Sequence, residues 1–340
     1  MRRMTFPHIL PVLALMAGLS LPVTATAAQT PSPAYLTQAE LERRYRLPQS
    51  RFIQIEDARI HYIDEGKGPV IVLLHGSSGS LRTYDHVAPR LVARGYRVIR
   101  YDEPNMGLSG PAPQTLYDRP LYPVIVLERM LTKLGVRSAS LVGVSSGGAA
   151  AFFFAARHPE KVEHLVLSNT PMGRADGKGV ALSRDLAREL AQSTPVKGRK
   201  SKIYRPLSYW QAFFRFYTGE PDRASSALLS QFYDMNRRKP VPDRLAMVEA
   251  LDDAAGVAEA LDAITAPTLL LWGARDPVLP PKKAADLQQA LHHAQVSTLM
   301  MPDVGHYPPL EVPERFADSV LAYLQSVTPV HPKAPPPSER

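Results

Sequence analysis

The chain has 340 residues, of which 45% are hydrophobic and 21% are charged. This composition is typical of a globular protein that is long enough for one large domain with an insertion. The sequence contains no cysteine, which excludes disulfides, thiolate metal sites, a lipid-modified cysteine and a cysteine nucleophile. The formal net charge of +8 has its densest patch at residues 197–202, without interleaved aromatics. We therefore expect a solvated basic loop there and no nucleic-acid partner.

The first 28 residues have the pattern of a secretory signal peptide. Arg2 and Arg3 form a basic start, an apolar segment follows over about residues 9–23, and the small residues after it contain an A-x-A pattern. A membrane anchor is less favoured, because the apolar run is shorter than the roughly 20 residues that span a bilayer. We expect cleavage near Ala27 or Ala28 and a periplasmic or secreted protein without a stable membrane anchor.

Strand-like and helix-like segments alternate along the rest of the chain. Residues 29–50 form an N-terminal arm with a short helix around residues 38–45, and the alternating residues 52–55 and 60–63 predict a hairpin. The continuous apolar run 70–74 predicts a strand buried on both faces. Further strands are expected at 96–101, 139–142, 162–167, 268–272 and 296–300, and helices at about 121–134, 149–157 and 315–325. The alternation predicts an α/β fold with a mostly parallel sheet.

One long segment interrupts this alternation. Residues 172–263 contain no convincing buried strand and are helical, basic and rich in aromatic residues. Because the segment is too long for a loop, we expect a helical cap inserted into a core made of residues 51–171 and 264–327. Most of its aromatic side chains should pack the cap on the core, and a minority should line a substrate pocket. The proline-rich tail, residues 328–340, is expected to be disordered.

Ser145 is the candidate nucleophile. It lies in the sequence Gly143-Val144-Ser145-Ser146-Gly147, between a strand-like and a helix-like run. A nucleophilic hydroxyl on a sharp, strained turn between strand and helix needs small neighbours, because larger side chains would collide. Taken alone, this pattern fits a small-residue helix start as well as it fits a nucleophile.

His306 and Asp276 are the candidate partners of this serine. His306 follows the last predicted strand in a glycine-histidine loop, where a general base would reach the carboxyl end of the sheet. Asp276 lies in a turn after a buried strand, where a carboxylate can orient the imidazole. Asp303 is less favoured because it is close in sequence to His306, and the segment 168–170 contains no carboxylate. The alternative is that Asp276 only stabilises its turn or caps a helix.

A glycine-rich turn after an early strand is the candidate oxyanion hole. The backbone N–H groups of Ser77 and Ser146 are expected to converge on the developing alkoxide. A merely flexible loop would fit the composition of this turn but not its position beside the strand. The residues expected to shape the two turns, rather than to react, are His75, Gly76, Gly143 and Gly147.

In the order of these motifs, the chain resembles the α/β-hydrolase fold superfamily over about residues 51–326. The resemblance also covers the segment 102–109, DEPNMGLS. It implies an eight-stranded, mostly parallel sheet flanked by helices, an antiparallel second strand, a cap between strands 6 and 7, and no cofactor or metal. Similar proteins often carry glycine where Asn105 stands, and asparagine tolerates the left-handed geometry of such a turn. Serine at position 145 disfavours the members with an aspartate nucleophile.

These observations predict a serine hydrolase that cleaves an ester or related acyl bond of a small organic substrate. Ser145, His306 and Asp276 would form the triad, and an acyl-enzyme would be the intermediate. A C–C bond hydrolase, an amidase or a perhydrolase of the same fold would share the triad and is an open alternative. A non-catalytic ligand-binding protein on the same scaffold is another. The sequence makes no prediction of the oligomeric state.

The N-terminus of the exported protein tests the signal-peptide assignment. We expect N-terminal sequencing of protein recovered outside the cytoplasm to begin at Ala28 or Gln29, because signal peptidase cleaves after small residues of this pattern. A recovered chain that still begins at Met1 contradicts the assignment.

Overall fold

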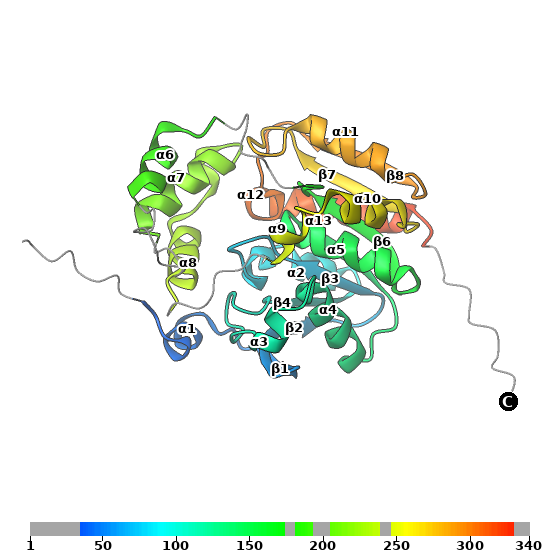
Figure 1. Cartoon of the computed structure of the whole chain (residues 1–340), viewed down its shortest axis with the longest axis horizontal. Coiled ribbons are helices and arrows are strands. Elements are labelled where there is room, and N and C mark those ends of the chain that lie inside the picture. The colour runs from blue at the N-terminus through cyan, green and yellow to red at the C-terminus, as the bar shows by residue number, and fades with distance from the viewer. Residues whose placement is uncertain (1–34, 174–180, 193–204, 239–245, 330–340) are drawn as a thin grey trace, which may run out of the picture. The chain divides into compact units, whose positions relative to one another are not determined.

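The structure is a computed structural model that describes the residues of four ranges (Figure 1). These residues are 35–173, 181–192, 205–238 and 246–329. Several predictions lie outside them, namely the signal peptide 1–28, the start of the arm, the basic patch 197–202 and most of the tail 328–340. Among the described helices, none combines the length and the apolar character needed to cross a membrane.

An eight-stranded sheet forms the centre of the fold, with the strand order β1-β2-β4-β3-β5-β6-β7-β8. β2 pairs antiparallel with β1 and β4, and the other neighbouring strands pair in parallel. The predicted eight-stranded, mostly parallel sheet with an antiparallel second strand is therefore confirmed. The strands are β1 (Arg51–Ile55), β2 (Ala58–Glu65), β3 (Val70–Leu74), β4 (Arg97–Tyr101), β5 (Ala139–Val144), β6 (Val162–Ser168), β7 (Thr268–Gly273) and β8 (Val296–Met301).

Successive residues of the central strands point to opposite faces of the sheet and join two separate apolar clusters. On β3, Val72 and Leu74 belong to one cluster, and Ile71 and Leu73 belong to the other. Because both faces are covered, every position of these strands favours an apolar residue. This burial explains the continuous apolar runs in the sequence.

Helices cover both faces of the sheet (Figure 1). α4 and α5 pack in the cluster of Val72 and Leu74, whereas α2 and α13 pack in the cluster of Ile71 and Leu73. Outside the segment between β6 and β7, the helices are α1 (Gln38–Tyr45), α2 (Ala88–Ala93), α3 (Gln114–Tyr117), α4 (Tyr122–Lys133), α5 (Ser146–Arg157), α11 (Pro281–Ala290), α12 (Pro308–Glu311) and α13 (Pro313–Ser326).

The segment between β6 and β7 is helical wherever the structure describes regular elements in it. These elements are α6 (Arg184–Gln192), α7 (Leu207–Tyr217), α8 (Ser226–Asn236), α9 (Ala246–Ala250) and α10 (Ala254–Asp262). α6 contacts α7, and α7 contacts α8, whereas α9 and α10 pack against α5 of the core (Figure 1). We therefore use the name cap helices for α6, α7 and α8 only. The predicted cap range 172–263 also includes helices that cover the sheet.

The N-terminal arm joins α8 to the core. Its helix α1 begins with a capping box, in which Thr37 and Glu40 satisfy each other's backbone N–H groups. Arg44 and Tyr45 donate hydrogen bonds of 2.7 and 2.8 Å to the Asp234 carboxylate on α8. Burial raises the pKa of Asp234, but hydrogen bonds from Arg237, Tyr45 and Arg44 outweigh this effect and hold its pKa below the usual value. An ionised Asp234 therefore fixes the arm to α8.

A buried carboxylate, Asp102, organises the turn after β4. It accepts hydrogen bonds of 2.6 Å from the N–H groups of Leu81 and Leu108, and it lies 2.7 Å from Nδ1 of His61. Burial raises the pKa of Asp102, but the charge and hydrogen bond of His61, together with the hydrogen bond from the Leu81 N–H, lower the pKa below its usual value. The ionised side chain thus connects β2, β4 and two loops.

Asn105 lies in the same turn and has the left-handed backbone geometry expected from the sequence. Its φ is +68°, a region that asparagine tolerates better than most residues. Its side-chain oxygen accepts a 3.2 Å hydrogen bond from the N–H of Ala112. The prediction that asparagine preserves this turn is confirmed.

We expect Asp102→Asn to lower the free energy of unfolding by about 3 kcal/mol at pH 7, because it leaves buried N–H donors without a charged acceptor. The folded pKa of Asp102 lies below its unfolded value of about 3.9. Its stabilising effect is therefore present above about pH 4 and is lost as the pH falls through the folded pKa. Urea unfolding of both proteins between pH 3 and pH 7 measures this difference.

The exposed Asp57 provides the control, and Asp57→Asn should change the unfolding free energy by less than about 0.5 kcal/mol. A difference between wild type and Asp102→Asn that stays constant from pH 7 to pH 3 contradicts the assignment of an ionised Asp102.

Candidate active site

Ser145 occupies a strained turn between β5 and α5. Its φ and ψ are +54° and −125°, a region that costs a non-glycine residue about 1–3 kcal/mol. The turn is held by a 2.9 Å hydrogen bond from the Ser145 N–H to the carbonyl of Ser168, and by N–H groups of α5 that donate to the Ser145 carbonyl. The side chain is therefore presented at the carboxyl end of the sheet by its backbone, as a nucleophile elbow requires.

The predicted glycines allow this elbow and the turn after β3 to touch. A side chain at Gly147 would overlap the carbonyl oxygen of His75, and one at Gly143 would overlap the backbone of Gly147. A Cβ at Gly76 would lie 3.1 Å from the Cβ of Ser145. Close contacts with neighbouring atoms therefore favour glycine over larger residues at these three positions.

The structure brings the three predicted reactive side chains into one hydrogen-bonded chain. Nε2 of His306 lies 3.0 Å from Oγ of Ser145, and Nδ1 of His306 lies 2.6 Å from Oδ2 of Asp276. The residues His306 and Asp276 are only 4% and 3% exposed. With a proton on Nδ1, the imidazole donates to the carboxylate and accepts from the serine hydroxyl, which is the geometry of a nucleophile, a base and an orienting acid.

Asp276 is held in place by donors from its own turn and from β6. Its Oδ1 accepts hydrogen bonds of 2.8 and 3.0 Å from the N–H groups of Val278 and Leu279. Its Oδ2 accepts a 2.7 Å bond from Nδ2 of Asn169, whose own oxygen accepts from the Gly273 N–H at 3.0 Å. Asn169 was not predicted as an orienting amide, because only a carboxylate was expected at this position. The available signal was a polar residue directly after a strand.

The loop that carries His306 is clamped by a second buried carboxylate, Glu311. It accepts hydrogen bonds of 3.0 and 3.2 Å from the N–H groups of Gly305 and Tyr307, on either side of the histidine. It also accepts a 2.7 Å bond from the N–H of Gly219, just after α7. Glu311 was not predicted from the sequence, where its only signal is an acidic residue shortly after the candidate base.

Asp303, the weaker candidate acid, has a different role. It binds Arg223 and Arg315 at 2.6 and 2.7 Å. The hydrogen bond from Arg315, against the opposing effect of burial and together with Arg223, lowers the pKa of Asp303 to about 2. The structure therefore places it in a surface ion-pair cluster, and Asp276 alone of the two contacts His306.

The turn after β3 presents the candidate oxyanion donors. The N–H of Gly79 donates to the carbonyl of Gly76 at 3.0 Å, and Ser78 has a left-handed φ of +62°, as in a type II turn. The Ser77 hydroxyl donates to the Ser146 hydroxyl at 3.0 Å, so the two turns lie side by side. Neither the Ser77 N–H nor the Ser146 N–H donates to a group within the described residues. Both are available to an oxyanion.

His75 shapes this turn, as the sequence analysis expects. Its Nδ1 lies 2.9 Å from the carbonyl of Gly76, and its Nε2 lies 3.1 Å from the N–H of Glu103. A neutral imidazole with its proton on Nδ1 satisfies both contacts, since Nε2 then accepts. With both nitrogens engaged by backbone, His75 has no free nitrogen for proton transfer.

An apolar cavity of about 220 Å³ opens beside Ser145. It is lined by Ser77, Ser78, Ser145, Pro171, Gly173, Phe213, Tyr217, Leu251, Val278, Leu279, His306 and Tyr307. Phe213 and Tyr217 come from the cap helix α7, whereas Trp210, Phe214 and Phe232 are buried by packing. Burial, reinforced by Tyr209 and Asp276, raises the pKa of Tyr217 to about 12, so its phenol is a neutral group in the wall.

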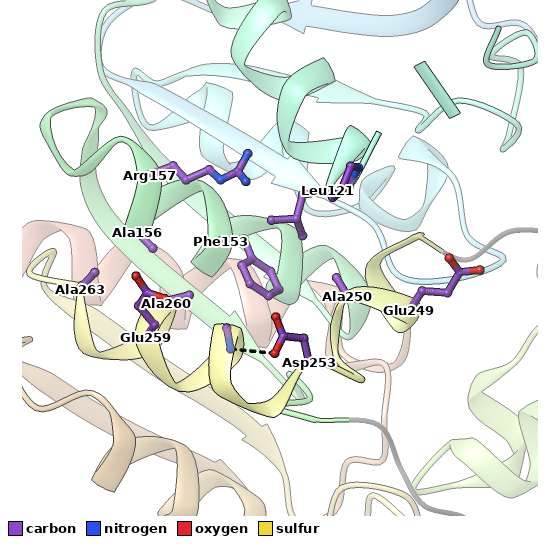
Figure 2. Close-up of a pocket in the computed structure, with 12 residues that line it drawn as sticks. Leu121, Phe153, Ala156, Arg157, Glu249, Ala250, Asp253, Glu259, Ala260 and Ala263 are labelled. Atoms are coloured by element: carbon purple, nitrogen blue, oxygen red, sulfur yellow. Dashed lines mark hydrogen bonds between the residues drawn. The ribbon is translucent and has the colours of Figure 1, made fainter. Parts of the chain in front are cut away.

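A larger cavity, of about 540 Å³, lies between α5, α9, α10 and the residues before α4 (Figure 2). Figure 2 shows Phe153 at its floor, with Arg157, Glu249 and Glu259 around its edge. It shares no lining residue with the cavity at Ser145. It contains no serine or histidine, so its described walls offer none of the chemistry found at Ser145.

A second serine–histidine–aspartate chain exists at the base of the arm. Oγ of Ser50 lies 2.8 Å from Nε2 of His61, whose Nδ1 lies 2.7 Å from Asp102. The Ser50 hydroxyl also accepts the N–H of Leu47 at 3.0 Å. Ser50, His61 and Asp102 are 6%, 1% and 1% exposed, so this chain fastens the arm to the sheet and is closed to a substrate.

Known proteins share this fold. A family model described as alpha/beta hydrolase fold matches residues 69–313. The 2-hydroxy-6-oxo-6-phenylhexa-2,4-dienoate hydrolase of Burkholderia cepacia is 28% identical over 291 residues, which cover 81% of this chain and 96% of that protein. The sn-1-specific diacylglycerol lipase ABHD11 of Mus musculus is 27% identical over 263 residues, with coverages of 75% and 81%. The structure of a thermophilic esterase from Thermogutta terrifontis matches with a TM-score of 0.63 at 22% identity, covering 82% of this chain and 99% of that chain.

The chain therefore belongs to the alpha/beta hydrolase fold family, as the sequence resemblance predicts. Within that family it is a hydrolase. The likeness to the esterase structure, at 22% identity, concerns the fold.

Proposed function

We propose that this protein is a serine hydrolase that cleaves an ester, or a related acyl bond, of a small organic substrate. The observation that supports this most directly is the hydrogen-bonded chain of Ser145, His306 and Asp276 beside an apolar cavity. In the proposed reaction, Oγ of Ser145 attacks the acyl carbon while Nε2 of His306 takes its proton. The proton then passes to the leaving alkoxide, which departs as an alcohol and leaves an acyl-enzyme.

Water completes the proposed cycle. His306 removes a proton from a water molecule as its oxygen attacks the acyl carbon, and then returns the proton to Ser145 as the carboxylic acid leaves. The oxyanion of each tetrahedral intermediate would accept hydrogen bonds from the N–H groups of Ser77 and Ser146, each worth roughly 10² to 10³ in rate. Asp276, held by its turn and by Asn169, would stabilise the imidazolium.

The character of the cavity favours an uncharged ester. Its described lining residues include no lysine, arginine, aspartate or glutamate. The substrate named for the Burkholderia relative is a dienoate, which carries a carboxylate, and a buried carboxylate requires a charged or hydrogen-bonding partner. C–C bond hydrolysis is the second candidate, because that relative is 28% identical over 81% of this chain.

We also propose that the enzyme acts outside the cytoplasm. Residues 1–28 support this proposal through their basic start, apolar core and small residues. The absence of cysteine means that folding after export requires no disulfide formation.

We expect Ser145→Ala to reduce hydrolysis of p-nitrophenyl acetate by at least about 10⁴-fold, and Asp276→Asn to reduce kcat by about 10⁴-fold because the imidazole loses its orienting acid. Initial rates at 405 nm, with circular dichroism to verify folding, measure both effects.

A fluorophosphonate probe gives an independent measurement of the nucleophile. It should label wild type at Ser145 and leave Ser145→Ala unlabelled, with no label on the buried Ser50. Retained hydrolysis by Ser145→Ala contradicts the assignment, and a wild type that neither turns over nor is labelled indicates a binding protein.

We expect short acyl groups to be preferred. The cavity of about 220 Å³ is smaller than the roughly 300–1,000 Å³ of pockets for drug-sized ligands. kcat/KM for p-nitrophenyl acetate and butyrate should exceed that for the decanoate by at least about tenfold, since unburied methylenes contribute no binding energy. Equal values across the series contradict the size argument, and faster turnover of a 2-hydroxy-6-oxodienoate than of any ester favours the C–C alternative.

A further inference from the structure

The backbone at Ser78 is strained and lies next to a proposed oxyanion donor. Ser78 has a φ of +62° at the third position of the turn from Gly76 to Gly79. This position of a type II turn prefers glycine, because a side chain resists the left-handed geometry. If φ of Ser78 relaxed to a negative value, the peptide between Ser77 and Ser78 would rotate, and Ser77 would shift so that its N–H left the oxyanion position. A contact from outside the turn would oppose this rotation.

A side chain from the cap helices binds the strained residue. Nδ2 of Asn236, the last residue of α8, donates a 2.9 Å hydrogen bond to the carbonyl oxygen of Ser78. The same nitrogen donates to the carbonyl of Phe232, one turn earlier in α8, also at 2.9 Å. The amide is thus fixed to its own helix while it binds the turn after β3.

The end of α8 is itself anchored, so Asn236 cannot drift with its helix. Arg238 donates hydrogen bonds of 2.8 Å to the Ser109 carbonyl and to the side chain of Gln38. The N–H of Leu36 donates to the carbonyl of Arg237 at 2.8 Å. Two residues before Asn236, the Asp234 carboxylate binds the arm residues described above. The arm and the turn after β4 therefore determine where the Asn236 amide lies.

We propose that Asn236 is a positioning residue for the oxyanion hole. Its amide holds Ser78 in the left-handed geometry and thereby directs the N–H of Ser77 toward the oxyanion of the intermediate. The cap helices would then contribute to transition-state stabilisation as well as to the wall of the cavity. This inference rests on the proposed serine-hydrolase function, because only that reaction forms an oxyanion at this place.

The variant Asn236→Ala should lower kcat for p-nitrophenyl acetate by about 10- to 100-fold. Removing an oxyanion donor outright lowers kcat by a factor of roughly 10² to 10³. The expected loss is smaller here, because the Ser77 N–H is misaligned rather than absent. KM should change by less than threefold, and the affinity for a trifluoromethyl ketone, which forms an oxyanion on Ser145, should fall by the same factor as kcat/KM. Asn236→Asp keeps the size of the side chain but replaces the amide donor with a carboxylate. It should lower kcat by a similar factor to Asn236→Ala.

Rescue by glycine distinguishes positioning from a general structural effect. Glycine adopts the geometry of Ser78 without strain, so adding Asn236→Ala to Ser78→Gly should lower kcat by less than about threefold. This non-additivity is the coupling expected if Asn236 acts through Ser78. Gln231→Ala, which removes another amide of α8, is the matched control and should leave kcat unchanged. Thermal unfolding verifies that each variant is folded.

Each outcome decides the proposal. Loss of kcat with glycine rescue supports it, whereas unchanged kcat in Asn236→Ala, or a loss that Ser78→Gly does not rescue, overturns it while the hydrolase function stands. If wild type neither hydrolyses esters nor reacts with a fluorophosphonate, the hydrolase function itself fails and the positioning role fails with it.

Discussion

The whole candidate site depends on how closely two turns of backbone approach each other. The elbow at Ser145 and the turn after β3 touch because Gly147 has no side chain to keep them apart. Their contact places the amides of Ser77 and Ser146 next to each other, as the 3.0 Å bond between their hydroxyls shows. Protein interiors are packed too densely for such a contact to adjust freely. The two N–H groups are therefore already positioned relative to the Ser145 hydroxyl before any substrate binds.

Buried carboxylates hold the loops around this contact. Asp102 accepts backbone N–H groups in the loops after β3 and β4, Asp276 accepts those of the turn after β7, and Glu311 accepts those that flank His306. A loop whose N–H groups bind an ionised, buried oxygen cannot rearrange without leaving a charge unpaired in a low dielectric. The bonds between buried carboxylates and backbone N–H groups therefore restrain the loops of the site. The sheet determines only where each loop begins.

The parts of the protein that follow from local patterns were predictable from the sequence. Continuous apolar runs identified the sheet. Ser145 was identified by the glycines that flank it, and Asp276 and His306 were identified by their loops after predicted strands, where open α/β sheets place their sites. Asn169 was not identified, because its partner Asp276 lies 107 residues away. Glu311 is close in sequence to Gly305 and Tyr307, but an acidic residue after a loop gives no sign in the sequence that its side chain turns back to bind that loop. Asn236 and Ser78 are 158 residues apart. The pattern of α9 and α10 likewise indicates helices, but it does not indicate that they pack on α5.

The buried chain of Ser50, His61 and Asp102 shows how little atomic arrangement alone says about catalysis. A survey that recognised serine hydrolases only by the distances between a serine, a histidine and an aspartate would count two centres among the described residues. Hydrolysis also needs space for the ester and then for the water molecule that releases the acyl group. Ser145 borders such a space, and Ser50 does not. The same three chemical groups thus form the proposed catalytic triad at Ser145 and hold the arm to the sheet at Ser50. The two places differ in their access to solvent.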